Sequence, residues 1–129
     1  MKRIKSKSDK RLIVEGSVNG KRACFMVDTG ASVGLMDCKQ RKEYALCEGR
    51  KYKGVLMGAG GKMKNVVHCD TFAEVHGKVI PQFLIADISD VVESIKRETN
   101  IPILGVISLD QMRMCGIGVD ANDMEIIIE

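Results

Sequence analysis

Asp28-Thr29-Gly30-Ala31-Ser32 is the stretch of this chain best suited to do chemistry, and it directly follows the apolar, strand-like run 23–27. A carboxylate in such a position can accept or donate a proton and so serve as a general acid or base. From average residue frequencies, the tripeptide Asp-Thr-Gly would occur by chance about 0.02 times in a chain of this length. The tripeptide is therefore suggestive on its own, and the rest of the sequence has to decide its meaning.

The length and composition of the chain fit one globular domain. With 129 residues, of which 45% are hydrophobic, the chain can bury a core but has no room for a second lobe of similar size. The sequence contains a single Asp-Thr-Gly and no internal repeat. A mechanism that needs two facing carboxylates would therefore require a second copy of the chain, related to the first by a two-fold axis.

Positive charge is concentrated at the N-terminus. The net charge is +3, but residues 1–11 hold six Lys or Arg and one Asp, so the rest of the chain carries a formal charge of −2. Because this segment lacks interleaved aromatic residues, we expect a solvated, poorly ordered basic leader over 1–11. The alternative is an RNA- or DNA-associated protein that uses this segment, which the near-neutral remainder of the chain disfavours.

Neither a membrane segment nor a metal site is expected. No apolar stretch reaches the roughly 18 residues of a membrane span, and no signal-peptide core follows the basic start, so we expect a soluble cytoplasmic protein without a membrane partner. The five cysteines are odd in number and form no C-x-x-C pair, which disfavours a disulfide framework or a structural zinc site. His68, Cys69 and His76 are more typical of strand and turn residues than of metal ligands. We expect no cofactor.

Short strands separated by turns dominate the pattern, which predicts a mostly β fold. Hairpins are predicted over 12–27, with its turn at Asn19-Gly20, over 52–69 and over 116–128. Further strands are predicted over 70–75, 79–86 and 101–105. Helices are predicted over 37–46, 87–98 and 108–114, with Asp37, Asp87 or Ser89, and Ser108 as their N-caps.

Two segments admit more than one interpretation. Gly58-Ala59-Gly60-Gly61 at the tip of the second hairpin could be a mobile flap over a cleft or a plain surface turn. A phosphate cradle is disfavoured because no G-x-x-x-x-G-K-[ST] pattern is present. The apolar run 126–128 would be an exposed edge in isolation, so either a partner subunit or the protomer's own barrel must cover it.

From about residue 12 to its end, the sequence resembles the retropepsin family, the small homodimeric aspartic peptidases of retroviruses and their bacterial and mobile-element relatives. The resemblance rests on Asp28-Thr29-Gly30-Ala31-Ser32, on Ile103-Leu104-Gly105 and on the glycine-tipped hairpin, which occur in the family's order. It implies a small closed acid-protease-type barrel with two or three short helices, formed by residues 12–129.

The resemblance also implies roles for these residues. Asp28 would be the catalytic carboxylate, and Thr29 would brace the two catalytic loops across the dimer axis. Within the same loop, Gly30 would donate its amide hydrogen to the carboxylate, and Ser32 would offer a hydroxyl to the outer carboxylate oxygen. Ala31 would be a further supporting residue of this loop. Two further groups are implied, a flap tip formed by Gly58, Ala59, Gly60 and Gly61, and packing behind the loop by Ile103, Leu104 and Gly105.

The implied function is that of an aspartic endopeptidase, a homodimer with one Asp28 per subunit that hydrolyses protein or peptide substrates by general acid–base activation of water. The chain departs from the family after Gly105: many relatives have an acidic residue within two or three positions, whereas here Val106-Ile107-Ser108 intervene before Asp110. The predicted helix over 87–98 is also more than the smallest retroviral enzymes have. These departures leave a second hypothesis open, a catalytically silent retropepsin-like module for peptide binding or dimerisation.

Overall fold

The computed structural model describes residues 1–58 and 60–129 and confirms the mostly β fold class. Its helices are one short 3-10 helix, η1 (Cys38–Gln40), and two α-helices, α1 (Ser89–Thr99) and α2 (Leu109–Cys115). Its strands are β1 (Lys2–Lys5), β2 (Ile13–Val18), β3 (Lys21–Asp28), β4 (Gly34–Asp37), β5 (Glu48–Lys51), β6 (Met57–Gly58), β7 (Gly61–Lys62), β8 (Val67–Cys69), β9 (Ala73–Val75), β10 (Lys78–Ile80), β11 (Phe83–Ala86), β12 (Gly105–Ser108), β13 (Ile117–Asp120) and β14 (Glu125–Ile128).

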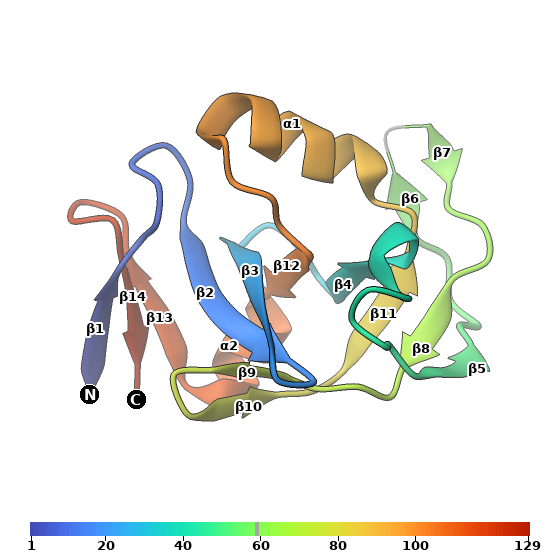
Figure 1. The fold of residues 1–129 in the computed structure, drawn as a ribbon, viewed down its shortest axis with the longest axis horizontal. Helices are drawn as coiled ribbons and strands as arrows, with labels where there is room; N and C mark the ends of the chain where they lie inside the picture. Colours follow the sequence, from blue (N-terminus) through green and yellow to red (C-terminus); the bar gives the residue numbers. More distant parts are fainter. Residues whose placement is uncertain (59) are drawn as a thin grey trace.

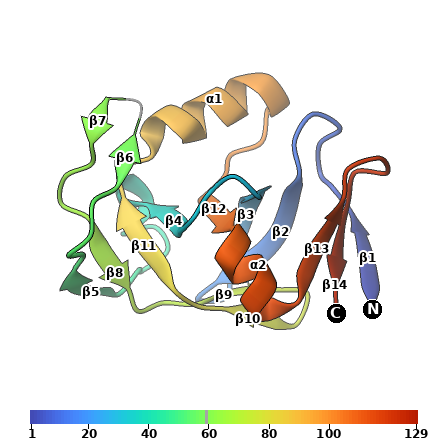
Figure 2. The same cartoon turned by 180° about the vertical axis from the view of Figure 1, so that it is seen from behind.

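One large sheet organises the molecule. Its strands follow the order β10-β9-β2-β3-β12-β4-β11-β8-β5, and the sheet curls into a half-barrel (Figure 1). Strand β12 runs parallel to β3 on one side and antiparallel to β4 on the other. Phe25, Met36, Phe83 and Ile107 are fully buried inside the curl, and the Phe25 and Phe83 rings lie 5.6 Å apart. Seen from behind, α2 lies in front of β12 and beside β13 (Figure 2).

The first hairpin forms as predicted. Asn19 and Gly20 both have positive φ angles, 52° and 78°, which a tight two-residue hairpin turn requires. In β3 the side chains of Ala23, Phe25 and Val27 are buried, while the residues between them lie on the half-buried face. This alternation carries β3 straight from the turn to Asp28, its last residue.

Lys2–Lys5 form strand β1, within the segment 1–11 where the sequence suggested a flexible leader. Strand β1 pairs with β14, which also pairs with β13, so the three form a small second sheet. Arg3 bonds Asp120 and Glu125 at 3.3 and 2.9 Å. Ile126 and Ile128 are buried, so the apolar run at the C-terminus is covered within the protomer. Three of the six basic residues of this segment, Arg3, Lys7 and Arg11, form ion pairs within the protomer.

Two of the three predicted helices form with nearly the expected bounds. Ser108 caps α2 in a capping box with Gln111, and the backbone N–H of Ser89 at the start of α1 donates to the Asp87 carboxylate at 3.0 Å. Asp37 does cap a helix, accepting from the Lys39 amide, but that helix is η1 and stops after three residues. No helix in the described ranges is long and apolar enough to cross a membrane.

Tertiary contacts explain the short helix at 38–40. Tyr44 and Leu46 are turned into the core, and the Asn19 side-chain amide donates to the carbonyl oxygens of Tyr44 and Ala45. Ala45 takes a left-handed conformation with φ 52°. The prediction of a helix over 37–46 was therefore wrong, because local helix preference yields to core packing and to these hydrogen bonds.

Replacing Ser108 with Ala should lower the free energy of unfolding by about 1 kcal/mol, because α2 loses its N-cap. The Ser108 hydroxyl is fully buried. It accepts from the Gln111 backbone N–H and donates to the Gln111 side-chain Oε1, both at 3.3 Å. Urea denaturation monitored by circular dichroism measures the change. Ser94→Ala, at an exposed position in α1, is the matched control and should not destabilise. Equal stability of Ser108→Ala and wild type would contradict the role of this cap.

Candidate active site

Asp28 lies where β3 ends and the loop 29–33 begins. Its side chain is half-buried, and its Oδ1 accepts a hydrogen bond from the Gly30 backbone N–H at 2.8 Å. The Ala31 N–H donates to the Asp28 carbonyl oxygen at 3.2 Å. A Cβ atom at position 30 would stand 3.2 Å from that same Oδ1, so glycine leaves room for the close approach. The loop thus folds back on the carboxylate and holds one of its oxygens.

The rest of the loop faces outward. Thr29, Gly30 and Ser32 are exposed, and Ala31 is half-buried. The Leu109 N–H at the start of α2 donates to the Ala31 carbonyl oxygen at 3.1 Å, which ties the loop to that helix. Within the described ranges, the hydrogen bond to the carboxylate comes from the Gly30 amide, and the Ser32 hydroxyl makes none to it.

The segment Ile103-Leu104-Gly105 lies beside β3, but level with residues that precede Asp28. Leu104 donates to the Cys24 carbonyl at 2.8 Å, and Gly105 is opposite Phe25. The residues level with the end of β3 come three positions later, because β12 runs parallel to β3 and places Ser108 opposite Asp28. Residues 103–105 therefore do not support the Asp28 loop by themselves, because Ser108, three positions further along the same segment, is the residue opposite Asp28.

Gln111 is a supporting residue that the sequence analysis did not single out. It is buried, its Oε1 accepts from the Ser108 N–H at 2.9 Å, and its Nε2 donates to the Pro81 carbonyl at 2.8 Å. Its amide also packs so closely on Gly34 that a Cβ there would collide with it. The S-x-x-Q spacing of a capping box, Ser108 to Gln111, was the signal that could have identified it.

Arg11 is a second such residue. The antiparallel register of β2 and β3 pairs Ile13 with Met26, and its continuation places Arg11 opposite Asp28. Arg11 forms a two-point ion pair with Glu98 in α1, at 2.5 and 3.2 Å. The pKa of Arg11 is raised, chiefly by the Glu98 hydrogen bond and to a smaller degree by the Asp28 charge, and the pKa of Glu98 is lowered by Arg11. Together with Met26, Arg11 and Asp28 line a pocket of about 270 Å³.

The glycine-tipped hairpin forms but does not lie against Asp28. Met57 pairs with Lys62, and Gly58 with Gly61, while Ala59 lies outside the described residues. In Figure 1 this β6–β7 hairpin stands beside the N-terminal end of α1. Gly58, Gly60 and Gly61 line a pocket of about 480 Å³ that also includes Asp87 and Asp90. In this single chain the hairpin and the carboxylate are therefore not brought together.

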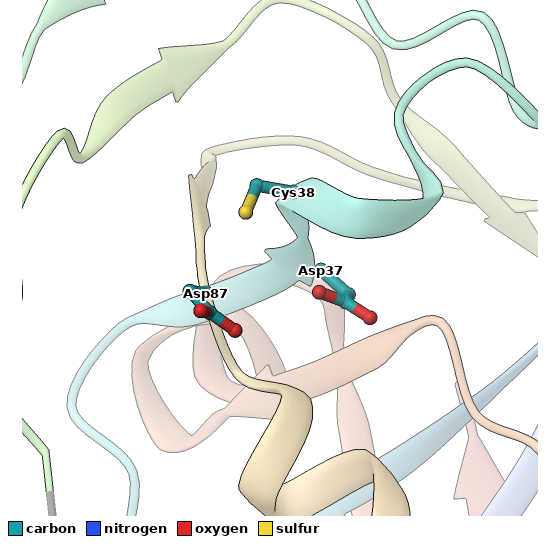
Figure 3. A group of neighbouring side chains, drawn as sticks. All are labelled: Asp37, Cys38 and Asp87. Carbon is teal, nitrogen blue, oxygen red and sulfur yellow. The ribbon is translucent and has the colours of Figure 1, made fainter.

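Asp37, Cys38 and Asp87 converge near η1, as Figure 3 shows, with ligand atoms within 4.8 Å of one another. The buried Asp37 carboxylate already accepts from the Lys39 N–H and the Gln40 amide, both at 3.1 Å, and Asp87 accepts from Ser89. Burial, with the two carboxylates, raises the pKa of the Cys38 thiol, so it stays protonated. Asp37 is the N-cap of η1 and Asp87 binds Ser89, the first residue of α1, so both carboxylates already have partners. The other residues considered as metal ligands are engaged elsewhere, His68 packing edge-on against Tyr52 and His76 forming the turn before β10.

Comparison with known proteins gives matches in structure only. No protein-family model and no curated protein matches the sequence. The EIAV protease complexed with the inhibitor HBY-793 is 20% identical with a TM-score of 0.62, covering 91% of this chain and 99% of that chain. The retroviral protease-like domain of Ddi1 from Leishmania major is 17% identical, with a TM-score of 0.61 and coverages of 92% and 88%. A retropepsin-like aspartic protease from Rickettsia conorii is 19% identical, with a TM-score of 0.59 and coverages of 98% and 88%.

These likenesses span nearly the whole chain and agree with one another, and they confirm the resemblance inferred from sequence at the level of fold. The chain therefore has the fold of the retropepsin-like aspartic proteases.

Proposed function

We propose that the protein is an aspartic endopeptidase that acts as a homodimer with one Asp28 per subunit. The observation that carries the proposal is the Asp28 loop itself, a half-exposed carboxylate bound by the Gly30 amide at the end of β3, in a chain with the retropepsin-like fold. A fold alone does not define a reaction, so the proposal depends on this site and not on the likeness.

A dimer is proposed because the reaction needs two facing carboxyl groups, and each chain supplies a single Asp-Thr-Gly loop. Within the described residues, no second carboxylate shares the 270 Å³ pocket with Asp28. The exposed Thr29 and Ser32 leave the loop open on its outer side, where a second copy could present its own Asp28 across a two-fold axis. The chain also has the length of one retropepsin-like protomer, since it covers 88 to 99% of the three solved structures.

The proposed mechanism follows from placing two carboxyl groups within hydrogen-bonding distance. Both cannot ionise at low cost, so the pair holds one proton and titrates as a unit. The ionised Asp28 takes a proton from a water molecule while the protonated Asp28 donates to the carbonyl oxygen, and the hydroxyl adds to the carbonyl carbon. The C–N bond then breaks as the amine leaves with a proton from the pair, and no covalent enzyme intermediate forms.

The surrounding residues position these groups. The Gly30 amide holds one carboxylate oxygen, and Ser108 with Gln111 fixes the strand beside it. The Arg11–Glu98 pair ties the segment before β2 to α1 next to Asp28. We propose that the substrate binds as an extended strand beneath the β6–β7 hairpin, which would have to approach the dimer axis to enclose it.

A second candidate function is a catalytically silent module for peptide binding or dimerisation. Two observations favour it. Val106-Ile107-Ser108 intervene between Gly105 and Asp110, a departure from the pattern of the resemblance, and the β6–β7 hairpin lies away from Asp28. Such a module would dimerise and bind peptides without cleaving them.

Peptidase activity should depend on protein concentration, because the monomer lacks half of the site. Below the dimer dissociation constant, the activity per milligram should fall in proportion to concentration, and above it the value should be constant. Sedimentation velocity over the same concentrations measures the dimer directly, and the two curves should share a midpoint. Undiminished activity per milligram from a solution that sediments as monomer would contradict the dimeric site.

A further inference from the structure

The segment that forms the β6–β7 hairpin and its arms is strongly basic. Residues 49–69 contain five Lys or Arg and no Asp or Glu, although the net charge of the whole chain is only +3. Of the six basic residues at the N-terminus, Arg3, Lys7 and Arg11 form ion pairs within the protomer, and Lys5 and Lys10 donate to backbone carbonyl oxygens. The five basic residues of the segment 49–69 are Arg50, Lys51, Lys53, Lys62 and Lys64.

The structure separates these five residues into two groups. Lys62 and Lys64 line the pocket of about 480 Å³ together with Glu48, Asp87 and Asp90, so acidic side chains face them. Arg50, Lys51 and Lys53 instead line a separate pocket of about 210 Å³. In the described part of the chain none of these three forms an ion pair, and the nearby Glu48 is taken by Arg41 at 3.2 Å.

The small pocket has the chemistry of a site for a carboxylate. Besides the three basic residues it is lined by Tyr52, Gly54 and His68, with the Tyr52 and His68 rings edge to face at 5.7 Å. A guanidinium binds a carboxylate through two parallel hydrogen bonds, and ammonium groups nearby add favourable charge. We call Arg50, Lys51, Lys53, Tyr52 and His68 the basic flank.

A larger groove borders the basic flank and extends to Val33, the last residue of the loop 29–33. This groove, of about 920 Å³, is lined by Arg50, Tyr52, His68 and Val33, whereas Asp28 lines the separate pocket of about 270 Å³. Leu84 forms its floor and is the register partner of His68. Asp70, whose carboxylate lies against Gly49, is the acidic residue among its lining. A peptide lying in the groove would contact the basic flank and the end of the loop that follows Asp28.

We propose that the basic flank is a specificity subsite that binds acidic side chains of the peptide, several residues away from the bond that is cleaved. The inference rests on the proposed function for its catalytic consequence, but binding can be tested without catalysis. An acidic peptide is favoured over a nucleic acid because the two rings pack against each other and offer no stacking platform, and because three charges around a small pocket do not track a phosphate backbone.

Binding is best measured with the full chain carrying Asp28→Asn, which keeps the probe intact. The probes are two fluorescein-labelled ten-residue peptides with the same apolar centre, one with three glutamates towards one end and one with glutamines there. The glutamate peptide should bind about tenfold more tightly at low ionic strength, and the difference should largely vanish in about 0.5 M salt. Fluorescence anisotropy gives both dissociation constants.

Arg50→Gln/Lys53→Gln should remove the preference, so that both peptides bind alike. The matched control is Lys96→Gln/Arg97→Gln, which removes the same charge from the exposed C-terminal end of α1, away from the β6–β7 hairpin (Figure 1). This control should keep the preference for the glutamate peptide. Equal affinity for the two peptides in the Asp28→Asn protein, no binding of either, or a preference untouched by the flank variant overturns the inference. Tighter binding of a ten-nucleotide single-stranded RNA through Arg50 and Lys53 also overturns it.

Failure of this inference is distinguishable from failure of the proposed function. If wild type cleaves both peptides at equal rates through Asp28, the endopeptidase proposal stands and the acidic subsite is wrong. If the glutamate peptide binds through the basic flank but wild type never cleaves it, the subsite stands and the silent-module hypothesis replaces the enzyme.

Discussion

Asp28→Asn is expected to lower kcat/KM for peptide cleavage by about a thousandfold or more. An amide can neither take a proton from water nor share one with a partner carboxyl, so both halves of the proposed acid–base pair lose their function. The fold should survive, because the Asn side-chain oxygen can still accept the 2.8 Å hydrogen bond from the Gly30 amide. Cleavage of a quenched fluorescent peptide, together with the thermal unfolding midpoint, separates lost chemistry from lost structure.

Mixing the two proteins adds a sharper test, since a dimer that carries Asp28→Asn in only one of its subunits should be inactive. With wild type held constant, adding excess Asp28→Asn should suppress activity as the active dimers are replaced by mixed ones. Asp9→Asn, an exposed position in the loop before β2, is the matched control and should neither lose activity nor suppress it. Cleavage by Asp28→Asn at the wild-type rate would show that Asp28 is not the catalyst.

Gly105→Ala is expected to have the largest effect on stability, lowering the free energy of unfolding by about 3 kcal/mol. A Cβ atom at this position would collide with the Leu35 carbonyl oxygen and stand 3.2 Å from the Met36 Cα, and both of these are backbone atoms of β4. No side-chain rotation can relieve this collision, so β12 would have to move away from β4. Because β12 also places Ser108 beside Asp28, peptide cleavage should fall together with stability.

Urea denaturation of Gly105→Ala and Gly118→Ala measures this effect against a matched control. Gly118 is also a strand glycine, but its Cβ would meet nothing closer than the Ile127 Cβ at 3.9 Å. Gly118→Ala should therefore stay within about 0.5 kcal/mol of wild type. Similar losses in the two variants would mean that strand glycine in general, and not the contact of β12 with β4, determines the cost.

Features that depend on neighbours in the chain could be inferred correctly from sequence. The Asn19-Gly20 turn and the Ser108 cap each depend on residues at most three positions apart, so composition and spacing carry enough information. The predicted helix over 37–46 shows the limit of this reasoning. Its residues favour a helix locally, but burying Tyr44 and Leu46 in the core stabilises the fold more than a longer helix would. The Asn19 side-chain amide also donates to the Tyr44 and Ala45 carbonyl oxygens.

The candidate site shows the same division. The sequence by itself determined that Asp28 sits on a glycine loop after a strand, that one chain holds one such loop, and that the domain is mostly β. Only the tertiary structure decided that β1 joins β14, that Glu98 in α1 is the partner of Arg11, and that the β6–β7 hairpin stands beside α1. Those contacts join residues that are tens of positions apart or more, and their partners are chosen by how the strands pack rather than by any local pattern.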